Sequence, residues 1–210
     1  MRRPLPVAIF MLQVILMLGA LLLWAIGVEA PLTADIVLFP AAFLAFGAVG
    51  ALILARDPRH RIGRLATLAG IGGSITAMFD SIARLAQPIA GQDWAGWIAA
   101  WAFPLTLGPP LLLILAFPTG RLASRGRRVV AASIAVGVVG LAIGNAFTPT
   151  LADYPTLANP VGLDAFAGSP LEQGGVAWLL VLGGASAAGV GLITRLRQAR
   201  GVERQQLKWI

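Results

Sequence analysis

The chain has 210 residues, of which 58% are hydrophobic and only 12% are charged, and its mean hydropathy is +0.82. A soluble domain carries about twice that share of charged residues, so the composition predicts a membrane protein. Cysteine is absent and histidine occurs once. This excludes disulfides, thiolate metal sites and cysteine nucleophiles, and it removes most metal and general-base arrangements.

Six stretches are long and apolar enough to cross a bilayer, which takes about 20 mainly apolar residues. Each must be a helix, because lipid cannot satisfy exposed backbone groups. The sequence therefore predicts an all-α membrane protein, a helical bundle of six transmembrane helices within residues 1–194, followed by a basic juxtamembrane segment, 195–210. The predicted spans are 5–27, 33–55, 65–87, 94–117, 129–147 and 174–194.

The first span follows two arginines, as a secretory signal peptide would. Its apolar run is longer than the roughly 7–15 residues of a signal core, so we expect the segment to be retained in the membrane.

Basic residues gather on alternate connections, and fifteen of the sixteen lie before the first span or after the second, fourth and sixth. Positive residues in short loops mark the cytoplasmic side. Both termini are therefore predicted to be cytoplasmic, in a bacterial plasma membrane. We expect the arginines of the two basic loops to contact anionic lipid headgroups: Arg56, Arg59, Arg61, Arg64, Arg121, Arg125, Arg127 and Arg128.

The net charge of +7 invites a nucleic-acid role. Membrane topology already accounts for these charges, so we expect no nucleic-acid partner. The stretch FPTGRLASRGRR (117–128) also lacks the GxxxxGK[ST] pattern of a phosphate-binding loop.

Ionisable residues inside membrane spans are costly and suggest a functional site. Asp80 and Arg84 are four residues apart on one face of the third span and can pair. Asp35, at the start of the second span, and Asn145, near the end of the fifth, reach the same outer level. These four residues predict an outward-facing polar pocket for a small polar or cationic ligand. In the alternative, Arg84 only extends to the outer headgroups and Asp80 balances its charge.

Small and polar residues also predict helix packing. Gln13, midway along the first span, predicts an interhelical hydrogen bond, and the glycines of GIGGS (70–74) predict close approach of helices. Gly140 and Gly144 on the fifth span have the same packing spacing. So do the small residues of the sixth span: Gly183, Ala187 and Gly191.

Prolines 104, 109 and 110 predict a bend or interruption in the fourth span, because proline removes a helix hydrogen bond. Broken helices line substrate sites in some transporters. The long outer connection 148–173 either caps the outer mouth of the bundle or is a slack tether. The few acidic residues are scattered and no base or metal set accompanies them, so we expect no catalytic site and no cofactor.

Four short motifs occur in order along the chain: RIGRL (61–65), FPTGRLASRGRR (117–128), NPVGL (159–163) and QARGVERQQLKW (198–209). Together they resemble the multi-span amino-terminal region of a group of bacterial sensor histidine kinases, and the resemblance covers essentially the whole chain. Arg64 stands where that family usually has tryptophan, and Ala123 where it usually has proline.

The resemblance implies a membrane sensor module of a two-component signalling protein, with a kinase as its cytoplasmic output region in cis or in trans. The sequence contains no phosphoacceptor-histidine region and no ATP-binding motif, so we expect this chain itself not to be an enzyme. It would be the sensing half of a kinase, a truncated product or a standalone relative. Its partners would be the bilayer and a second copy of the chain in a homodimer. The alternatives are a small transporter or channel and a structural membrane partner.

Overall fold

The computed structural model describes residues 4–29, 33–117, 120–122, 124–170 and 172–198, except for the side chains of 34, 35, 173, 196 and 198. Within them the chain is helical and contains no strand, and six helices are long and apolar enough to cross a membrane. The predicted all-α fold, with six helices long and apolar enough to cross a membrane, is thereby confirmed. The helices are α1 (Pro4–Gly27), α2 (Ala34–Arg56), α3 (Arg61–Ala83), α4 (Gln92–Ala116), α5 (Arg125–Phe147) and α6 (Gly175–Gln198), with short 3₁₀ helices η1 (Asp164–Phe166) and η2 (Glu172–Gly174) before α6.

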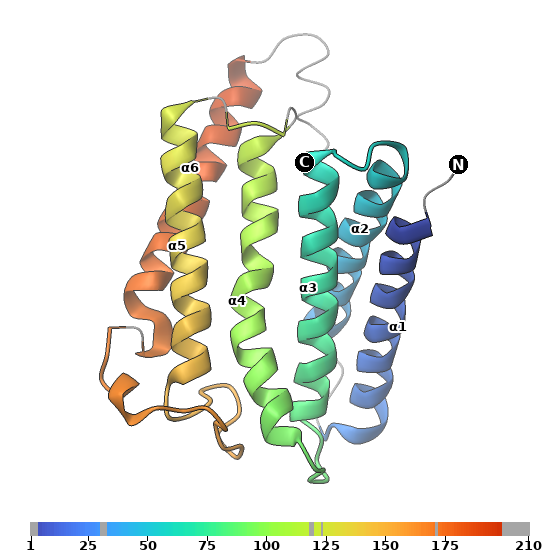
Figure 1. The fold of residues 1–210 in the computed structure, drawn as a ribbon, viewed down its shortest axis with the longest axis vertical. Coiled ribbons are helices and arrows are strands. Elements are labelled where there is room, and N and C mark those ends of the chain that lie inside the picture. Colours follow the sequence, from blue (N-terminus) through green and yellow to red (C-terminus); the bar gives the residue numbers. More distant parts are fainter. Residues whose placement is uncertain (1–3, 30–32, 118–119, 123, 171, 199–210) are drawn as a thin grey trace.

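The six helices stand side by side (Figure 1), and two apolar clusters divide them into two groups. Helices α1, α2 and α3 share one apolar cluster, which includes Met17, Phe43 and Ala69. Helices α4, α5 and α6 share another, which includes Leu115, Ile134 and Val181. Contact between α3 and α4 joins the groups, so these two helices form the centre of the bundle.

Gln13 lies at the centre of the first group and is completely buried. Its Nε2 donates to the carbonyl oxygen of Thr67 on α3 at 3.2 Å, which confirms the predicted interhelical hydrogen bond. Room for the side chain comes from two glycines, since a Cβ at Gly70 would lie 2.8 Å from both Gln13 Nε2 and the Cα of Gly47. Small residues thus let three membrane helices meet around one polar group.

Helices α5 and α6 pack closely at glycines other than those predicted on the sixth span, Gly183 and Gly191. A Cβ added at Gly183 or Gly191 meets no atom within 4 Å. The close approach is made instead at Gly184, where a Cβ would lie 2.4 Å from Ile134, and at Gly137, where it would lie 2.8 Å from the Ala177 carbonyl oxygen. Spacing alone does not distinguish these two faces of α6.

Two helices begin earlier than the apolar pattern indicates. Helix α3 begins at Arg61 rather than at residue 65, and α5 begins at Arg125 rather than at 129. Ser124 caps α5, because its Oγ accepts a hydrogen bond from the Arg127 backbone N–H at 3.2 Å. Arginine is itself a good helix former. Several predicted loop arginines therefore lie in first helical turns.

Helix α4 is continuous from Gln92 to Ala116 although it contains three prolines. Of the two predicted outcomes, a bend or an interruption, the interruption is therefore wrong. At Pro104, which has no N–H to donate to Ala100 four residues earlier, Asn145 of α5 supplies the missing donor. Its Nδ2 lies 2.8 Å from the Ala100 carbonyl oxygen.

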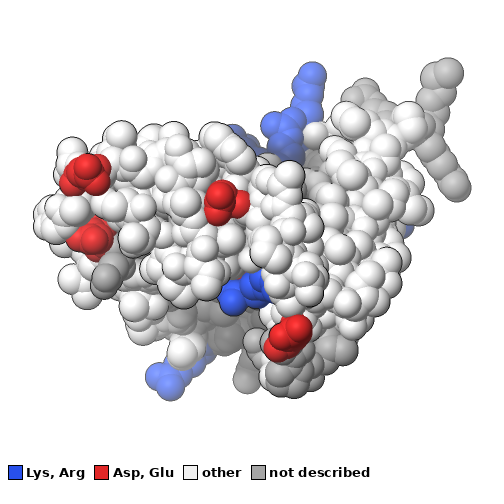
Figure 2. All heavy atoms as spheres, turned by 90° about the horizontal axis from the view of Figure 1, so that it is seen from below, with Lys and Arg blue, Asp and Glu red and all other residues white. Residues whose placement is uncertain are grey.

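The two ends of the bundle differ in charge. The arginine-rich end contains the connections 57–60 and 117–124 and the last turn of α6. The acidic end contains the connections 84–91 and 148–174. Figure 2 looks at the acidic end and shows separate acidic side chains on a largely uncharged face.

Candidate functional site

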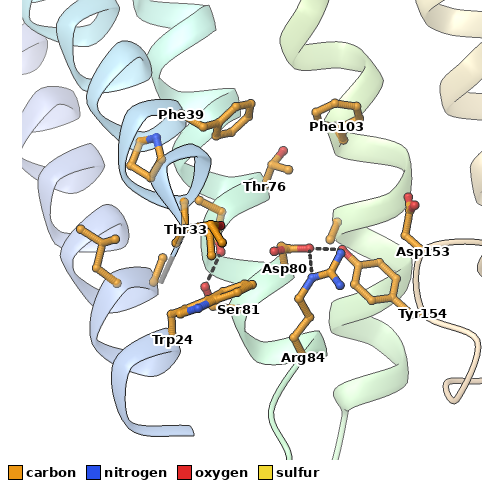
Figure 3. A pocket seen from close by; sticks show the side chains of 16 residues that line it. Trp24, Thr33, Phe39, Thr76, Asp80, Ser81, Arg84, Phe103, Asp153 and Tyr154 are labelled. Carbon is orange, nitrogen blue, oxygen red and sulfur yellow. Dashed lines mark hydrogen bonds and ion pairs between the residues drawn. The ribbon is translucent and has the colours of Figure 1, made fainter. Parts of the chain in front are cut away.

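A cavity of about 610 Å³ opens at the acidic end of the bundle. Its wall comes from α1, α2, α3 and α4 and from the connection after α5, as Figure 3 shows. Aromatic and polar side chains line it together. The lining residues are Ala20, Leu21, Trp24, Thr33, Ile36, Phe39, Pro40, Thr76, Ala77, Asp80, Ser81, Arg84, Ala99, Phe103, Asp153 and Tyr154.

Asp80 is the centre of a polar network in this wall. Its Oδ1 accepts from Arg84 Nε at 2.9 Å and from the Tyr154 hydroxyl at 2.5 Å. The Arg84 guanidinium also lies over the Tyr154 ring, 5.0 Å from its centroid. The side chains of Arg84 and Asp80 are 39% and 28% exposed. One carboxylate thus holds together a helix end and a residue 74 positions away in the chain.

Tyr154 is the buried member of this network and is 6% exposed. Burial in the loop–helix interface, together with the adjacent Asp80 carboxylate, raises the pKa of Tyr154 above its ordinary value of 10.0. The phenol therefore stays protonated and keeps donating to Asp80 at neutral pH.

The connection that carries Tyr154 packs firmly on the helices. Leu151 and Tyr154 join Ala83 of α3 and Ala99 of α4 in a buried apolar cluster. Gly96 of α4 leaves the space they need, since a Cβ there would lie 3.2 Å from Leu151. These contacts make this part of the connection a cap over the acidic end, one of the two roles that the sequence left open.

The same connection is also fixed by polar groups. The Asp93 carboxylate at the start of α4 accepts from the Ala158 backbone N–H at 3.0 Å. In the NPVGL motif, Asn159 Nδ2 donates to the carbonyl oxygens of Ala146 and Thr148 at 3.2 and 2.6 Å. The motif therefore satisfies the carbonyl groups left open at the end of α5.

Two hydrogen-bond groups that line the cavity have no partner among the described residues. They are the indole Nε1 of Trp24 and the hydroxyl of Thr76, and both atoms are buried. Phe39 and Phe103 line the same cavity, with ring centroids 6.3 Å apart. Unpaired polar groups beside apolar rings are the usual composition of a small-molecule site.

The four residues predicted for the pocket have different places. Asp80 and Arg84 lie together in the cavity wall. Asn145 does not point there, since its amide bonds to the backbone of α4. Asp35 lies in the first turn of α2, and its side chain is outside the described part of the chain.

Tyr154, Trp24 and Thr76 were not predicted as site residues. A signal for Tyr154 was available, because it is the only tyrosine and lies in the only long connection. Trp24 and Thr76 read from the sequence as ordinary span residues, so only the packing of the helices shows that they face a cavity.

The predicted headgroup arginines also separate into two sets. Arg61, Arg64, Arg121 and Arg128 line a second cavity at the arginine-rich end. The remaining four lie at the same end, but they are not among the residues that line it: Arg56, Arg59, Arg125 and Arg127.

Among the described residues, no group of three or more histidine or acidic side chains could hold a metal ion. No model of a known protein family, no curated protein and no solved structure matches the chain.

Proposed function

We propose that the chain is a membrane-embedded input module of the sensor-kinase type, which binds a small polar or cationic molecule in the cavity at the acidic end. The observation that carries this proposal is the Asp80–Arg84–Tyr154 network, which ties the end of α3 to the cap over the cavity. A ligand that competes for these groups changes how the cap is held. The cavity is therefore placed where binding can alter helix packing.

The chemistry of the wall limits the ligand. Two carboxylates, of Asp80 and Asp153, and one guanidinium, of Arg84, line the cavity, so the formal charge of the wall favours a neutral or cationic molecule. The buried Trp24 Nε1 and Thr76 hydroxyl have no partner among the described residues, and a ligand that reaches them would bond to them through acceptor oxygens. The aromatic walls suit an apolar body of small size.

Transmission toward the other end depends on α4, which borders the cavity and also contacts α6. Arg195 of α6 donates to the carbonyl oxygens of Phe117 and Ile114 at 2.7 and 2.8 Å. A cation at the carboxyl end of α4 is favoured by the helix dipole. Movement of α4 is thereby coupled to the helix that leads into residues 195–210, the proposed link to a kinase output region.

The test is a spectroscopic distance measurement on the full chain in lipid nanodiscs. The chain has no native cysteine, so spin labels at Leu68→Cys on α3 and Ile193→Cys on α6 report one distance. Both side chains are at least half exposed. A library of small polar compounds is first screened by thermal stabilisation of the wild type, and any stabilising compound is then added to the labelled protein.

We expect a compound that stabilises the wild type, fails to stabilise Asp80→Asn, and shifts the α3–α6 distance. The matched control is Asp164→Asn, which changes an exposed carboxylate at the same end and is expected to respond like the wild type. Flux of the compound into liposomes that contain only this chain would identify a transporter instead. A chain that neither binds nor transports any compound would be a structural partner, and the proposal would be wrong.

We further propose that the arginine-rich end is cytoplasmic. Its support is the concentration of arginine in the short connections of that end. Arg59→Cys and Asp164→Cys place single exposed thiols at opposite ends. A membrane-impermeant maleimide added to intact cells should label only Asp164→Cys, and labelling of only Arg59→Cys would reverse the orientation.

A further inference from the structure

A second cavity, of about 640 Å³, lies at the arginine-rich end between α3, α4 and α5. Four arginines line it, two from the start of α3, one from the turn after α4 and one from the start of α5. Three leucines complete its apolar wall. The lining residues are Arg61, Arg64, Leu65, Leu112, Ala116, Gly120, Arg121, Leu122 and Arg128.

The fold brings these arginines together from two separate connections. Gly120 turns the chain after α4 with φ +70°, a conformation that favours glycine, and its N–H donates to the Ala116 carbonyl oxygen at 2.8 Å. A Cβ at Gly120 would lie 3.3 Å from the Cβ of Arg61. Glycine therefore allows this turn to rest against the start of α3, which places the basic side chains of both connections around one hollow.

Three of the four arginines of this cavity have side chains that form no ion pair with any described residue. The Arg61 and Arg128 side chains have no hydrogen bond or ion pair there, and the Arg64 side chain donates only to the Pro58 carbonyl oxygen, at 3.3 Å. The nearby carboxylate, Asp57, accepts from the Arg59 backbone N–H. Like charges held together repel one another, so the arrangement favours an anion in the cavity.

The start of α3 adds to this field. Its N-cap residue, His60, makes no side-chain capping bond, so the first backbone N–H groups leave a partial positive charge at the helix end. Arg61 at this end lines the cavity. The helix end supports the charge of the guanidinium groups in attracting an anion.

We propose that this cavity binds a phosphate group. Guanidinium groups match the geometry of phosphate oxygens and bind them through paired hydrogen bonds. The phosphate belongs either to an anionic lipid headgroup or to a soluble phosphate compound. Basic pockets between membrane helices on the cytoplasmic side bind lipid headgroups, and the leucine wall of Leu65, Leu112 and Leu122 offers contact to a hydrocarbon chain. The site is independent of the ligand cavity at the acidic end.

The test uses the full chain, purified in neutral detergent and freed of lipid. Its thermal unfolding midpoint is measured with added phosphatidylglycerol, with phosphatidylcholine and with inorganic phosphate. We expect phosphatidylglycerol to raise the midpoint by several degrees and phosphatidylcholine to have little effect. An equal rise with inorganic phosphate would identify a soluble phosphate compound as the ligand of the same site.

The variant Arg61→Gln/Arg128→Gln removes two lining charges and should lose most of the rise. The matched control, Arg56→Gln/Arg125→Gln, removes two charges from the same end but outside the cavity wall, and should keep it. Equal losses in both variants would show attraction to a general basic surface and overturn the proposal, as would the absence of any rise in the wild type.

A second measurement guards against a variant that folds poorly. Lipids retained by the wild type and by each single variant, Arg61→Gln and Arg128→Gln, are counted by native mass spectrometry. We expect a bound phospholipid on the wild type and a several-fold lower occupancy on each single variant. Unchanged occupancy on both would contradict the assignment of this cavity.

Discussion

The two ends of the bundle differ in whether their charged side chains have partners within the chain. At the acidic end, Asp80 and Arg84 pair at 2.9 Å and a tyrosine from a distant connection completes the network. At the arginine-rich end, Arg61 and Arg128 have no partner among the described residues. The first arrangement is satisfied by the chain itself, whereas the second requires a counter-charge from its surroundings.

This difference separates two uses of ionisable residues in a membrane protein. A charge that is partly buried needs an internal partner, because water solvates it only in part. A charge at the interface reaches water and lipid headgroups, so it needs no partner within the chain. Loss of a charge should therefore affect the stability of the fold at the acidic end and the binding of anions at the other.

The largest effect is expected for Asp80→Ala. The change removes the acceptor of both Arg84 and Tyr154, and a partly buried guanidinium is left without its partner. We expect a loss of about 2 kcal/mol in the free energy of unfolding, measured by denaturant titration in detergent micelles. Asp164→Ala, at an exposed position of the same end, should cost less than about 0.5 kcal/mol, and similar losses for both variants would contradict the comparison.

Arg195→Gln tests an arginine that has internal partners although it lies at the arginine-rich end. This guanidinium donates to the carbonyl oxygens of Ile114, in the last turn of α4, and of Phe117, directly after it. Its loss should therefore cost about 1.5 kcal/mol. The same denaturant titration measures it. Arg197→Gln, an exposed neighbour on α6, provides the control, and a cost as small as that of the control would show that Arg195 does not clamp the helices.

Asn145→Ala should cost about 1 kcal/mol, because it leaves the Ala100 carbonyl oxygen without a donor. Pro104→Ala restores the backbone N–H four residues later. In the background of Pro104→Ala the asparagine change should therefore cost much less. A double-mutant cycle measures this coupling, and a coupling energy near zero would mean that Asn145 does not compensate for Pro104.

Alkaline pH tests the burial of Tyr154. The folded state holds the phenol proton more tightly than the unfolded state, whose pKa is near the ordinary 10.0. The resulting stability is fully present below pH 10 and is lost as pH rises above it. Because Tyr154 is the only tyrosine, phenolate absorbance reports it alone. We expect the signal only on unfolding, and half-ionisation near pH 10 in the folded chain would show an exposed phenol.

The smallest effect on stability is expected for Arg61→Gln/Arg128→Gln without lipid. Both side chains are exposed and make no bond to any described residue, so the free energy of unfolding should change by less than about 0.5 kcal/mol. Denaturant titration in neutral detergent measures it. A loss as large as that of Asp80→Ala would show that the two ends do not differ.

Much of the fold follows from local sequence patterns. Apolar length is enough to place six helices, and Gln13 with Gly70 indicates where three of them meet. The pattern misses helix ends, because arginine is polar yet helix-forming, so α3 and α5 begin before their apolar segments. It also misses the continuity of α4, which depends on a donor from α5, a helix that the prolines of α4 do not reveal.

Half of the candidate site could be predicted, because only its local contacts are visible in the sequence. Asp80 and Arg84 are four residues apart on one helix, so their pairing is local and the sequence predicts it. Tyr154, which completes the network, comes from a connection far along the chain. Trp24 and Thr76 face the cavity only because of how α1 and α3 pack.

By itself, the sequence determined the six apolar helices and the division of charge between the two ends, because hydrophobic length and loop charge are local properties of the chain. Only the tertiary structure decided which charges are paired and which are open. Both outcomes depend on distances between residues far apart in sequence. The hydrogen bond of Tyr154 to Asp80 shows this for a paired charge, and the close approach of Gly120 to Arg61 shows it for an open one.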